Sequence, residues 1–588
     1  MNILVEPLYI GFFQFIISLI IISGLIFLGQ HINLLLFRKY QNALFDLIIS
    51  LIILSQFLKI FTYLGFFKYI YLFFTYFLLI AGIYNLKNIY ISCKNFEYSI
   101  PKLKIEIFII FSLFLLFLIS IAPPSMADAL DYHYGIPLYL LNFNKIPSID
   151  FWLYANVGGN GDIFNSLALT LGTDNFVSFL QFLSLILFLL FLKKEIKNQS
   201  KFIFLSVFII SSPTILQLLS GPKFMILPQI MTGLALYLFI KSKKIETVDF
   251  LFIAILLMGA SQFKSSFLIS GSIIGLLTLF KAIKFTNLKI YFYIFLLTSF
   301  FFLPTAIWNF NQVNDFELIN IFSIMPDEMM NNMKQFKENN YVYPFNIFIP
   351  SSFGKISTVL GFQIFLLLVF FYKSKNFKFI MYIMFSTILL HFYLGMNVGR
   401  MYYEYILWGS IAFIFIKNKN INYNFYTKLI LPQTILIFCF CVYFVSISIS
   451  SLFSNNARNN FMINNAFYYE GIEWVNQNLP INAKIISTIR PVALLKNEFA
   501  PTDWLDFYSH ENDLVKYFEL IKKSKFDHIL LVDNDKTHPL INCTGKLLNK
   551  SKRFKKSTRN PFNRKSYYSL SIYSFNYKML PNCFNNNL

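Results

Sequence analysis

Long apolar segments alternate with short polar segments along most of the chain. Segments such as 8–28 and 428–450 approach the roughly 20 residues with which a helix crosses a hydrocarbon core of about 30 Å. The alternation predicts about fourteen membrane-spanning helices. They are expected near residues 8–28, 42–60, 64–84, 106–122, 176–192, 202–219, 224–241, 248–263, 266–281, 290–308, 357–372, 378–396, 402–417 and 428–451. The predicted fold class is therefore an α-helical polytopic membrane protein.

Composition favours the same fold class. Hydrophobic residues make up 56% of the 588 positions, with 74 phenylalanines and 35 tyrosines, which is more apolar than a typical soluble domain. The first apolar segment has no basic stretch before it and no small-residue cleavage signal. We therefore expect it to remain in the protein as a membrane span and not to be removed as a signal peptide.

The basic residues of the short loops predict the orientation of the spans. Short cytoplasmic loops are enriched in Lys and Arg, so the side that collects these residues is expected to be cytoplasmic. Those residues are Arg38, Lys39, Lys87, Lys94, Lys102, Lys104, Lys193, Lys194, Lys197, Lys241, Lys243, Lys244, Lys281, Lys284, Lys373, Lys375, Lys417 and Lys419. The loops 123–175 and 309–356 fall on the opposite, external side. The first of them carries Asp128, Asp131, Asp150, Asp162 and Asp174 against Lys145 alone.

The chain changes character after Ser451. Ile472, Val475 and Leu479 repeat at helical spacing before Pro480, and the segments AKIISTI and FDHILLVDND have the pattern of short buried strands. These features predict a soluble α/β domain over residues 452–588, which the alternation of spans places in the periplasm. The transmembrane domain then covers residues 1–451.

Cysteine and charge patterns add little chemistry. The five cysteines have no metal-ligand spacing, and Cys543 and Cys583 of the soluble segment allow one disulfide. The formal net charge is +21, and a run without acidic residues extends from Lys546 to Lys565. Such a run either forms a solvated surface or meets lipid phosphates at roughly 1 kcal/mol per charge. No nucleic-acid partner is expected.

The first external loop holds the most informative residues. Pro123 and Pro124 end a span, because a proline ring obstructs the helix. Asp128 and Asp131 follow, three positions apart, so that in a helix both carboxylates face one way. Carboxylates held close together separate in pKa, and one can stay ionised as a base or metal ligand. The alternative is that Asp128 only caps a surface helix that begins at Ala129.

The passage ADALDYHYGIPLYLL, followed by Trp152, a glycine pair and the pattern G-D-x-x-N, resembles the GT-C superfamily of integral membrane glycosyltransferases. The segment EGIEWVNQNLPINAKIIST resembles the start of their soluble domains. The resemblance implies inverting transfer of a sugar from a polyprenyl-phosphate donor to a cell-envelope glycan, glycolipid or protein acceptor at the periplasmic face of a bacterial inner membrane. It implies that Asp128, with Asp131 as its rival, is the general base. Several of the expected spans precede the motif, whereas one is usual in that superfamily.

A phosphate leaving group needs nearby cations. Arg400 is our preferred donor-phosphate residue, and pairing with Glu404 or location at the membrane interface is the alternative. Lys264 and Lys223 are further candidates for phosphate binding, or else interface lysines. The candidate substrate-binding residues are Tyr132, His133 and Asp162.

A divalent cation, Mg²⁺ or Mn²⁺, bridges the acidic motif and the donor phosphate in some relatives. In this chain Asp128, Asp131 and His133 would hold it, together with Asp327 or Glu328 from the later loop. Three other functions stay open. One is an O-antigen polymerase or ligase, for which external arginines are scarce. The second is a transporter or flippase of lipid-linked saccharides, for which charged spans and internal repeats are lacking. The third is a non-catalytic assembly subunit.

Overall fold

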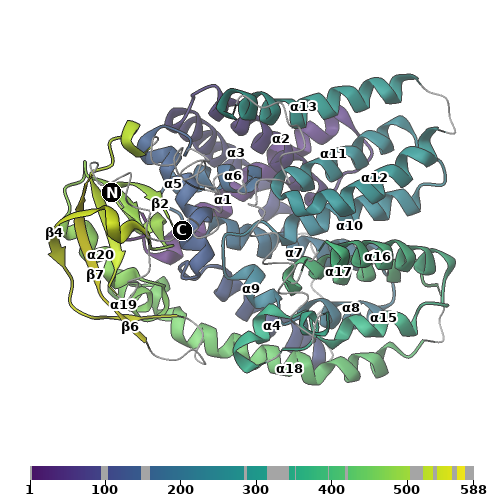
Figure 1. Cartoon of the computed structure of the whole chain (residues 1–588). Coiled ribbons are helices and arrows are strands. Elements are labelled where there is room, and N and C mark those ends of the chain that lie inside the picture. Colours follow the sequence, from purple (N-terminus) through teal and green to yellow (C-terminus); the bar gives the residue numbers. More distant parts are fainter. Residues whose placement is uncertain are drawn as a thin grey trace.

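The computed structural model describes a mostly helical protein that carries a small C-terminal sheet (Figure 1). The described residues are 3–94, 104–147, 152, 159–283, 288–313, 344–350, 352–394, 396, 398–417, 421–502, 521–533, 539–558 and 566–576. The α-helices are α1 (Gly11–Leu36), α2 (Ala43–Tyr63), α3 (Lys68–Lys94), α4 (Lys104–Ser120), α5 (Tyr134–Phe143), α6 (Gly159–Leu169), α7 (Phe176–Glu195), α8 (Gln199–Ile210), α9 (Ile215–Leu219), α10 (Ile226–Lys241), α11 (Thr247–Phe263), α12 (Leu268–Ile283), α13 (Leu288–Val313), α15 (Leu366–Val369), α16 (Lys375–Tyr393), α17 (Tyr403–Ile414), α18 (Tyr423–Ser448), α19 (Asn455–Asn465) and α20 (Tyr469–Asn478).

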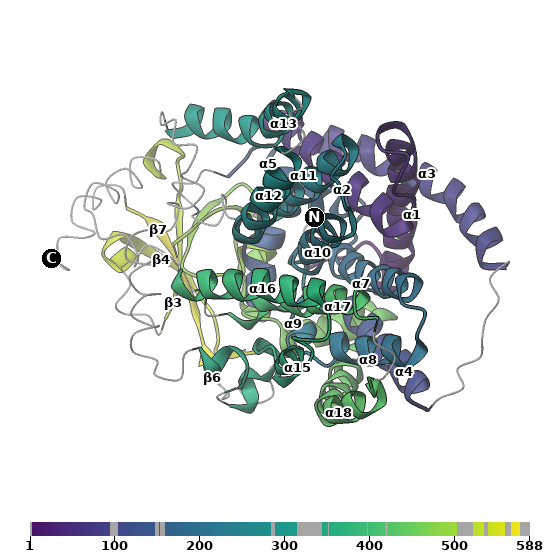
Figure 2. The ribbon, with the colours of Figure 1, turned by 90° about the vertical axis from the view of Figure 1, so that its right-hand side faces the viewer.

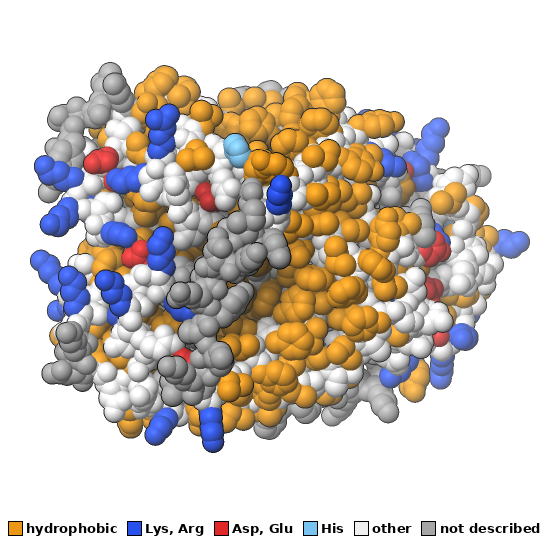
Figure 3. Space-filling view, turned by 180° about the vertical axis from the view of Figure 1, so that it is seen from behind, with side chains coloured by type: hydrophobic (Ala, Val, Ile, Leu, Met, Phe, Trp, Pro, Cys, Tyr) orange, Lys and Arg blue, Asp and Glu red, His pale blue; other side chains and the backbone are white. Residues whose placement is uncertain are grey.

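Seven helical segments among the described residues are long and apolar enough to cross a membrane. They are Gly11–Leu36, Ala43–Tyr63, Lys68–Lys87, Phe176–Glu195, Ser265–Ala282, Ile290–Ile307 and Tyr423–Leu452. Hydrophobic side chains form a broad band over the surface, whereas Lys and Arg side chains gather mainly at its two ends (Figure 3). Exposed apolar residues such as Tyr69, Ile80, Phe295 and Leu389 belong to these helices or to α16. A surface of this kind is stable in lipid and not in water, so the chain is a membrane protein.

The structure does not confirm fourteen spans. The apolar run 202–219 is divided between α8 and α9, with Pro213 in the gap. The run 357–372 contains only short helical turns, among them η6 (Phe362–Phe365) and α15, and Gly361 precedes them at φ +94°. Proline and a left-handed glycine both interrupt helical hydrogen bonding, which a count of apolar residues does not detect.

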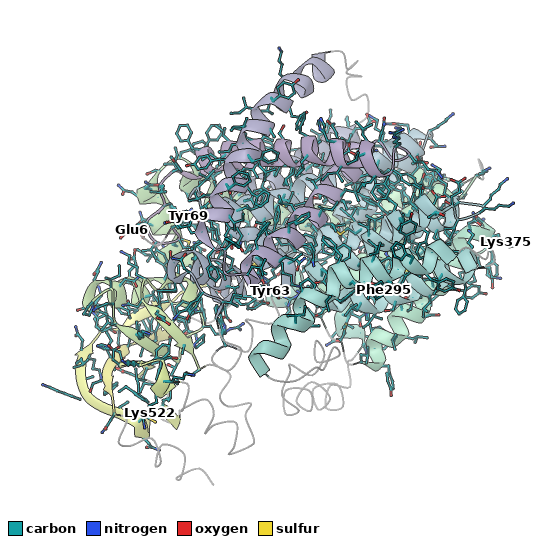
Figure 4. All side chains as sticks on the ribbon, turned by 90° about the horizontal axis from the view of Figure 1, so that it is seen from above. Glu6, Tyr63, Tyr69, Phe295, Lys375 and Lys522 are labelled. Atoms are coloured by element: carbon teal, nitrogen blue, oxygen red, sulfur yellow. The ribbon has the colours of Figure 1, made fainter. Side chains whose placement is uncertain are left out.

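Several loops that the sequence places on the cytoplasmic side lie close together in the structure. Lys39 pairs with Glu246 at 3.1 Å and with Asp249 at 2.7 Å, and Lys241 pairs with Glu195 at 3.4 Å. All of these residues border loops expected on the cytoplasmic side. In Figure 4, Lys375 lies at one end of the molecule, Glu6 and Lys522 lie toward the other, and Tyr63 and Phe295 lie between them. The basic loops and the C-terminal domain therefore occupy opposite ends of the apolar band.

The C-terminal region forms a unit beside the helices (Figures 1 and 2). Its strands are β1 (Lys484–Ser487), β2 (Glu498–Pro501), β3 (His528–Val532), β4 (Thr544–Lys550), β5 (Phe554–Lys556), β6 (Ser566–Tyr568) and β7 (Leu570–Phe575). Five of them form a sheet in the order β2-β1-β3-β7-β4, in which β1 is parallel to β2 and β3, and β7 is antiparallel to β3 and β4. The two predicted strands correspond to β1 and β3, and the predicted helix to α20. Strands β5 and β6 form a separate antiparallel pair.

The C-terminal domain packs on α5, the helix that directly follows the acidic motif in the chain. The hydroxyl of Tyr139 on α5 donates a hydrogen bond of 3.1 Å to Glu498 Oε1. The ring of Phe499 lies 5.5 Å from the ring of Tyr139 and 5.4 Å from that of Trp152, edge to face. Aromatic pairs of this geometry contribute about 0.5–1.5 kcal/mol each beyond their burial. This contact brings the loop after β1 next to residues 128–133.

Candidate functional site

The acidic motif lies on a π-helical turn, η1 (Ala129–His133), between α4 and α5. Asp128 precedes the turn in a right-handed helical conformation, and its side chain makes no capping hydrogen bond. The alternative that Asp128 serves only as a helix cap therefore has no support in the structure. π-Turns recur at functional sites, because the extra residue redirects side chains within a helix. Here both carboxylates of the motif reach the same cation.

Three basic side chains surround the carboxylate of Asp128. Lys223, in the loop before α10, donates a hydrogen bond to Oδ2, and an Arg400 amino group lies 3.8 Å from the same oxygen. Arg490 of the C-terminal domain donates to Oδ1 at 3.1 Å. Burial on its own would raise the pKa of Asp128, but the charges of Lys223, Arg490 and Arg400 outweigh burial and hold that pKa well below its usual range. Asp128 is therefore an anion at neutral pH.

Asp131 is fully buried and shares Arg490 with Asp128. The Nε atom of Arg490 donates a bond of 3.0 Å to Asp131 Oδ2, and the Arg490 side chain is 36% exposed. One guanidinium thus bridges both carboxylates of the motif. A rigid planar fork suits this task, because its donors point at two acceptors simultaneously.

Lys264 adds a fourth basic group near the cluster. It lies between α11 and the short turn η3 (Ser265–Phe267), and among the described residues it forms no ion pair. Burial, followed by the charges of Arg400 and Lys223, lowers the pKa of Lys264 to about 7. Burial and the Arg400 charge lower the pKa of Lys223 to about 8. Cations that lower each other's pKa in this way favour the arrival of an additional anion.

The three candidate substrate-binding residues lie beside this cluster. His133 Nδ1 is 2.7 Å from Asp162 Oδ1, and both side chains are buried. Burial, followed by the positive charges of Lys223 and Lys264, lowers the pKa of His133 well below its usual value, so that its ring is neutral. Its Nε2 atom and Asp162 Oδ2 have no hydrogen-bond partner among the residues that the structure describes. The ring of Tyr132 lies 4.1 Å from the ring of His133.

Arg400 belongs to the turn η7 (Gly399–Tyr402) and points to Asp128. Its backbone carbonyl accepts a 2.9 Å hydrogen bond from Gln229 on α10, which fixes the turn beside the loop that carries Lys223. Glu404, the alternative partner of Arg400, instead accepts a hydrogen bond from Thr232. The structure therefore brings together Asp128, Asp131, Arg400 and Lys223, which the sequence singled out from three distant segments.

A divalent cation does not fit the described residues. Both oxygens of Asp128 accept hydrogen bonds from cationic side chains, Oδ1 from Arg490 and Oδ2 from Lys223. Mg²⁺ and Mn²⁺ require oxygen ligands that no competing cation occupies. Within the described part of the chain, no group of three or more acidic, His or Cys side chains is placed to hold a metal. Asp327 and Glu328, the expected additional ligands, lie outside the described residues.

Arg490 is the site residue that sequence reasoning missed. It stands directly after the predicted strand AKIISTI and before Pro491, so it marks the end of a buried strand, where side chains often reach a neighbouring element. Its position at the end of a strand is the feature of the sequence that could have identified it. The soluble domain was expected in the periplasm, but nothing in the local pattern paired it with residues 128–131.

Comparison with known proteins places the whole site within one family. Residues 75–462 match the DUF1420 N-terminal domain, and residues 464–588 match the DUF1420 C-terminal domain. Asp128, Lys223, Lys264 and Arg400 fall in the first match, and Arg490 falls in the second. No curated protein matches the chain. The two matches cover most of the sequence, and the chain therefore belongs to the DUF1420 family.

Proposed function

We propose that this protein is an inverting membrane glycosyltransferase of the GT-C type. It moves a sugar from a polyprenyl-phosphate donor to a cell-envelope glycan, glycolipid or protein acceptor at the periplasmic face of a bacterial inner membrane. One observation carries the proposal. Two adjacent carboxylates, Asp128 and Asp131, lie among Lys223, Arg400 and Arg490, at the junction between apolar helices and the C-terminal domain.

The chemistry follows from the charges. The oxygen of the acceptor hydroxyl attacks the anomeric carbon of the donor sugar, while the bond from that carbon to the phosphate oxygen breaks. The hydroxyl proton passes to the carboxylate of Asp128, and the polyprenyl phosphate leaves with the bonding electron pair. Attack opposite the leaving group inverts the anomeric configuration. Lys223, Lys264 and Arg400 stabilise the negative charge that develops on the phosphate.

The surroundings of the cluster suit a lipid-linked donor. A polyprenyl chain needs apolar surroundings, and exposed hydrophobic side chains form a broad band over the surface of the protein (Figure 3). Its phosphate needs cations near the end of that apolar band, which the cluster supplies. Cys543 is disulfide-bonded, and disulfides persist in oxidising compartments such as the periplasm. Cys583, the partner that the sequence allows, lies outside the described residues. Fourteen membrane crossings and a periplasmic domain over 452–588 stay predictions.

The test is a comparison of Asp128→Asn and Asp131→Asn cells with cells that carry the unaltered protein. Lipid-linked sugar and finished envelope glycan are measured together, and Asp527→Asn, an exposed position in the C-terminal domain, is the matched control. We expect Asp128→Asn to lose product and accumulate donor, with membrane insertion unchanged. Full product formation by the double variant would reject the proposal that this protein is the glycosyltransferase. Failure of the saccharide lipid to cross the membrane, with transfer intact, would favour a transporter or flippase.

A further inference from the structure

We propose that Arg490 binds the donor phosphate, so that the C-terminal domain supplies part of the active site. This inference rests on the proposed function and adds to it a residue from the other matched domain. In the structure Arg490 bridges the two carboxylates, at 3.1 Å from Asp128 Oδ1 and 3.0 Å from Asp131 Oδ2. Asp131 is fully buried beneath it, whereas the Arg490 side chain is 36% exposed. Of these three side chains Arg490 is the most exposed, because the Asp128 side chain is 25% exposed.

The chemistry of the side chain suits an exchange of anions. The planar fork of N–H donors on a guanidinium matches a phosphate as well as a carboxylate. Arg400 and Lys223 already contact Asp128 Oδ2 from the membrane domain. A phosphate that enters among these groups would be contacted by cations from both domains.

The position of Arg490 is set by contacts outside the carboxylate pair. Pro491 and the turn η9 (Val492–Leu494) follow it, and η9 packs against both η1 and α5. On the next strand, Glu498 accepts hydrogen bonds from Tyr139 and Lys145, and Lys484 lies 3.3 Å from it. The domain thus stays docked on α5 when the Arg490 side chain turns from the carboxylates to a phosphate.

The exchange orders the reaction. While Arg490, Lys223 and Arg400 are paired with Asp128, that carboxylate is too stabilised as an anion to accept a proton readily. A donor phosphate competes for the same cations. When they turn toward it, Asp128 loses stabilising partners and its affinity for a proton rises. The base therefore becomes competent only when the donor is in place.

The test is binding of three probes to the purified full-length protein in detergent: polyprenyl phosphate, the uncharged polyprenol of the same length, and inorganic phosphate. Each is measured for the unaltered protein and for Arg490→Ala, Arg490→Lys and Lys496→Ala. Lys496 is the control, because it belongs to the same domain but pairs with Glu6 at 2.6 Å. Thermal unfolding and limited proteolysis check that the domain remains docked in each variant.

We expect Arg490→Ala to weaken binding of polyprenyl phosphate at least about tenfold, since charge-assisted hydrogen bonds are roughly twice as strong as neutral ones. Arg490→Lys should retain part of the affinity, and polyprenol binding should not change. Binding of inorganic phosphate with the same dependence on Arg490 would show that the phosphate alone is recognised. Unchanged polyprenyl phosphate affinity in Arg490→Ala, or an equal loss of polyprenol binding, would overturn the inference. If Asp128→Asn abolishes transfer in that case, the proposed function stands although the inference about Arg490 fails. Binding that depends on Arg490 without any transfer would instead reject the glycosyltransferase.

Discussion

The Nε atom of Arg490 lies 3.0 Å from Oδ2 of Asp131, although 359 positions separate the two residues in the chain. This contact joins the two matched domains of the protein at the charged cluster around Asp128. It also gives the fully buried carboxylate of Asp131 a charged partner, which offsets part of the cost of burying it. The site is therefore a property of both domains, and its tests have to use the full chain.

Binding of a lipid-linked sugar phosphate should weaken as the pH rises from about 6.5 to 9. The pKa values of Lys264 and Lys223 are lowered to about 7 and about 8, so both side chains lose their positive charge over this range. An interaction that shifts a pKa by one unit corresponds to a change of about tenfold in binding affinity when it is lost. The phosphodiester donor does not titrate here, which leaves the protein as the source of the change.

Lys264→Arg is the matched variant for this pH dependence. An arginine keeps its charge at pH 9, so the affinity of the variant should fall less steeply than that of the unaltered protein. The measurement is donor affinity at half-unit pH steps in detergent. An affinity that rises with pH, or a profile that Lys264→Arg leaves unchanged, would contradict the role of Lys264 in phosphate binding.

A second buried ion pair, away from the acidic motif, predicts a loss of stability. Arg458 on α19 pairs with Asp174, which precedes α7, and both side chains are at least 97% buried. Asp174→Asn leaves a buried guanidinium without its charge partner, which costs about 3–5 kcal/mol. The melting temperature of the purified protein should fall clearly. Lys496→Ala, which breaks an exposed pair with Glu6, should change stability by no more than about 1 kcal/mol. Equal melting curves for the two variants would show that the ion pair between Arg458 and Asp174 does not stabilise the protein.

Much of the helical layout and the acidic motif could be predicted from the sequence, because both are local signals. Apolar runs report spans, and Asp128 and Asp131 follow a pair of prolines at the end of one. The division of 202–219 at Pro213 shows the limit of hydropathy, which counts apolar side chains and ignores backbone breaks.

Cation partners could not be predicted in the same way. Lys223 has the sequence context of an interface lysine, and only the packing of α10 against its neighbours reveals that it is 2% exposed and paired with Asp128. Arg490 lies in another domain, and its contact depends on how that domain docks on α5. Long-range pairings of this kind leave no trace in periodicity or spacing.

Orientation can be tested by accessibility labelling in spheroplasts. Lys375→Cys and Lys522→Cys place a thiol at opposite ends of the apolar band (Figure 4). With a membrane-impermeant maleimide, we expect Lys522→Cys to react in intact spheroplasts and Lys375→Cys to react only after lysis. The unaltered protein, which has five cysteines, gives the background. Reaction of Lys375→Cys alone in intact spheroplasts would place the C-terminal domain in the cytoplasm. The site could then not bind a lipid-linked donor at the periplasmic face, which would contradict the proposed function.

The most direct measurement is sugar transfer by the purified protein in liposomes, with a radiolabelled polyprenyl-phosphate sugar as donor and extracted envelope glycolipid as acceptor. The account predicts that the unaltered protein moves label to the acceptor, and that Asp128→Asn slows this transfer by about 100-fold or more, as expected for loss of a general base. Donor binding should persist in that variant. Transfer at the unaltered rate by Asp128→Asn would contradict the account.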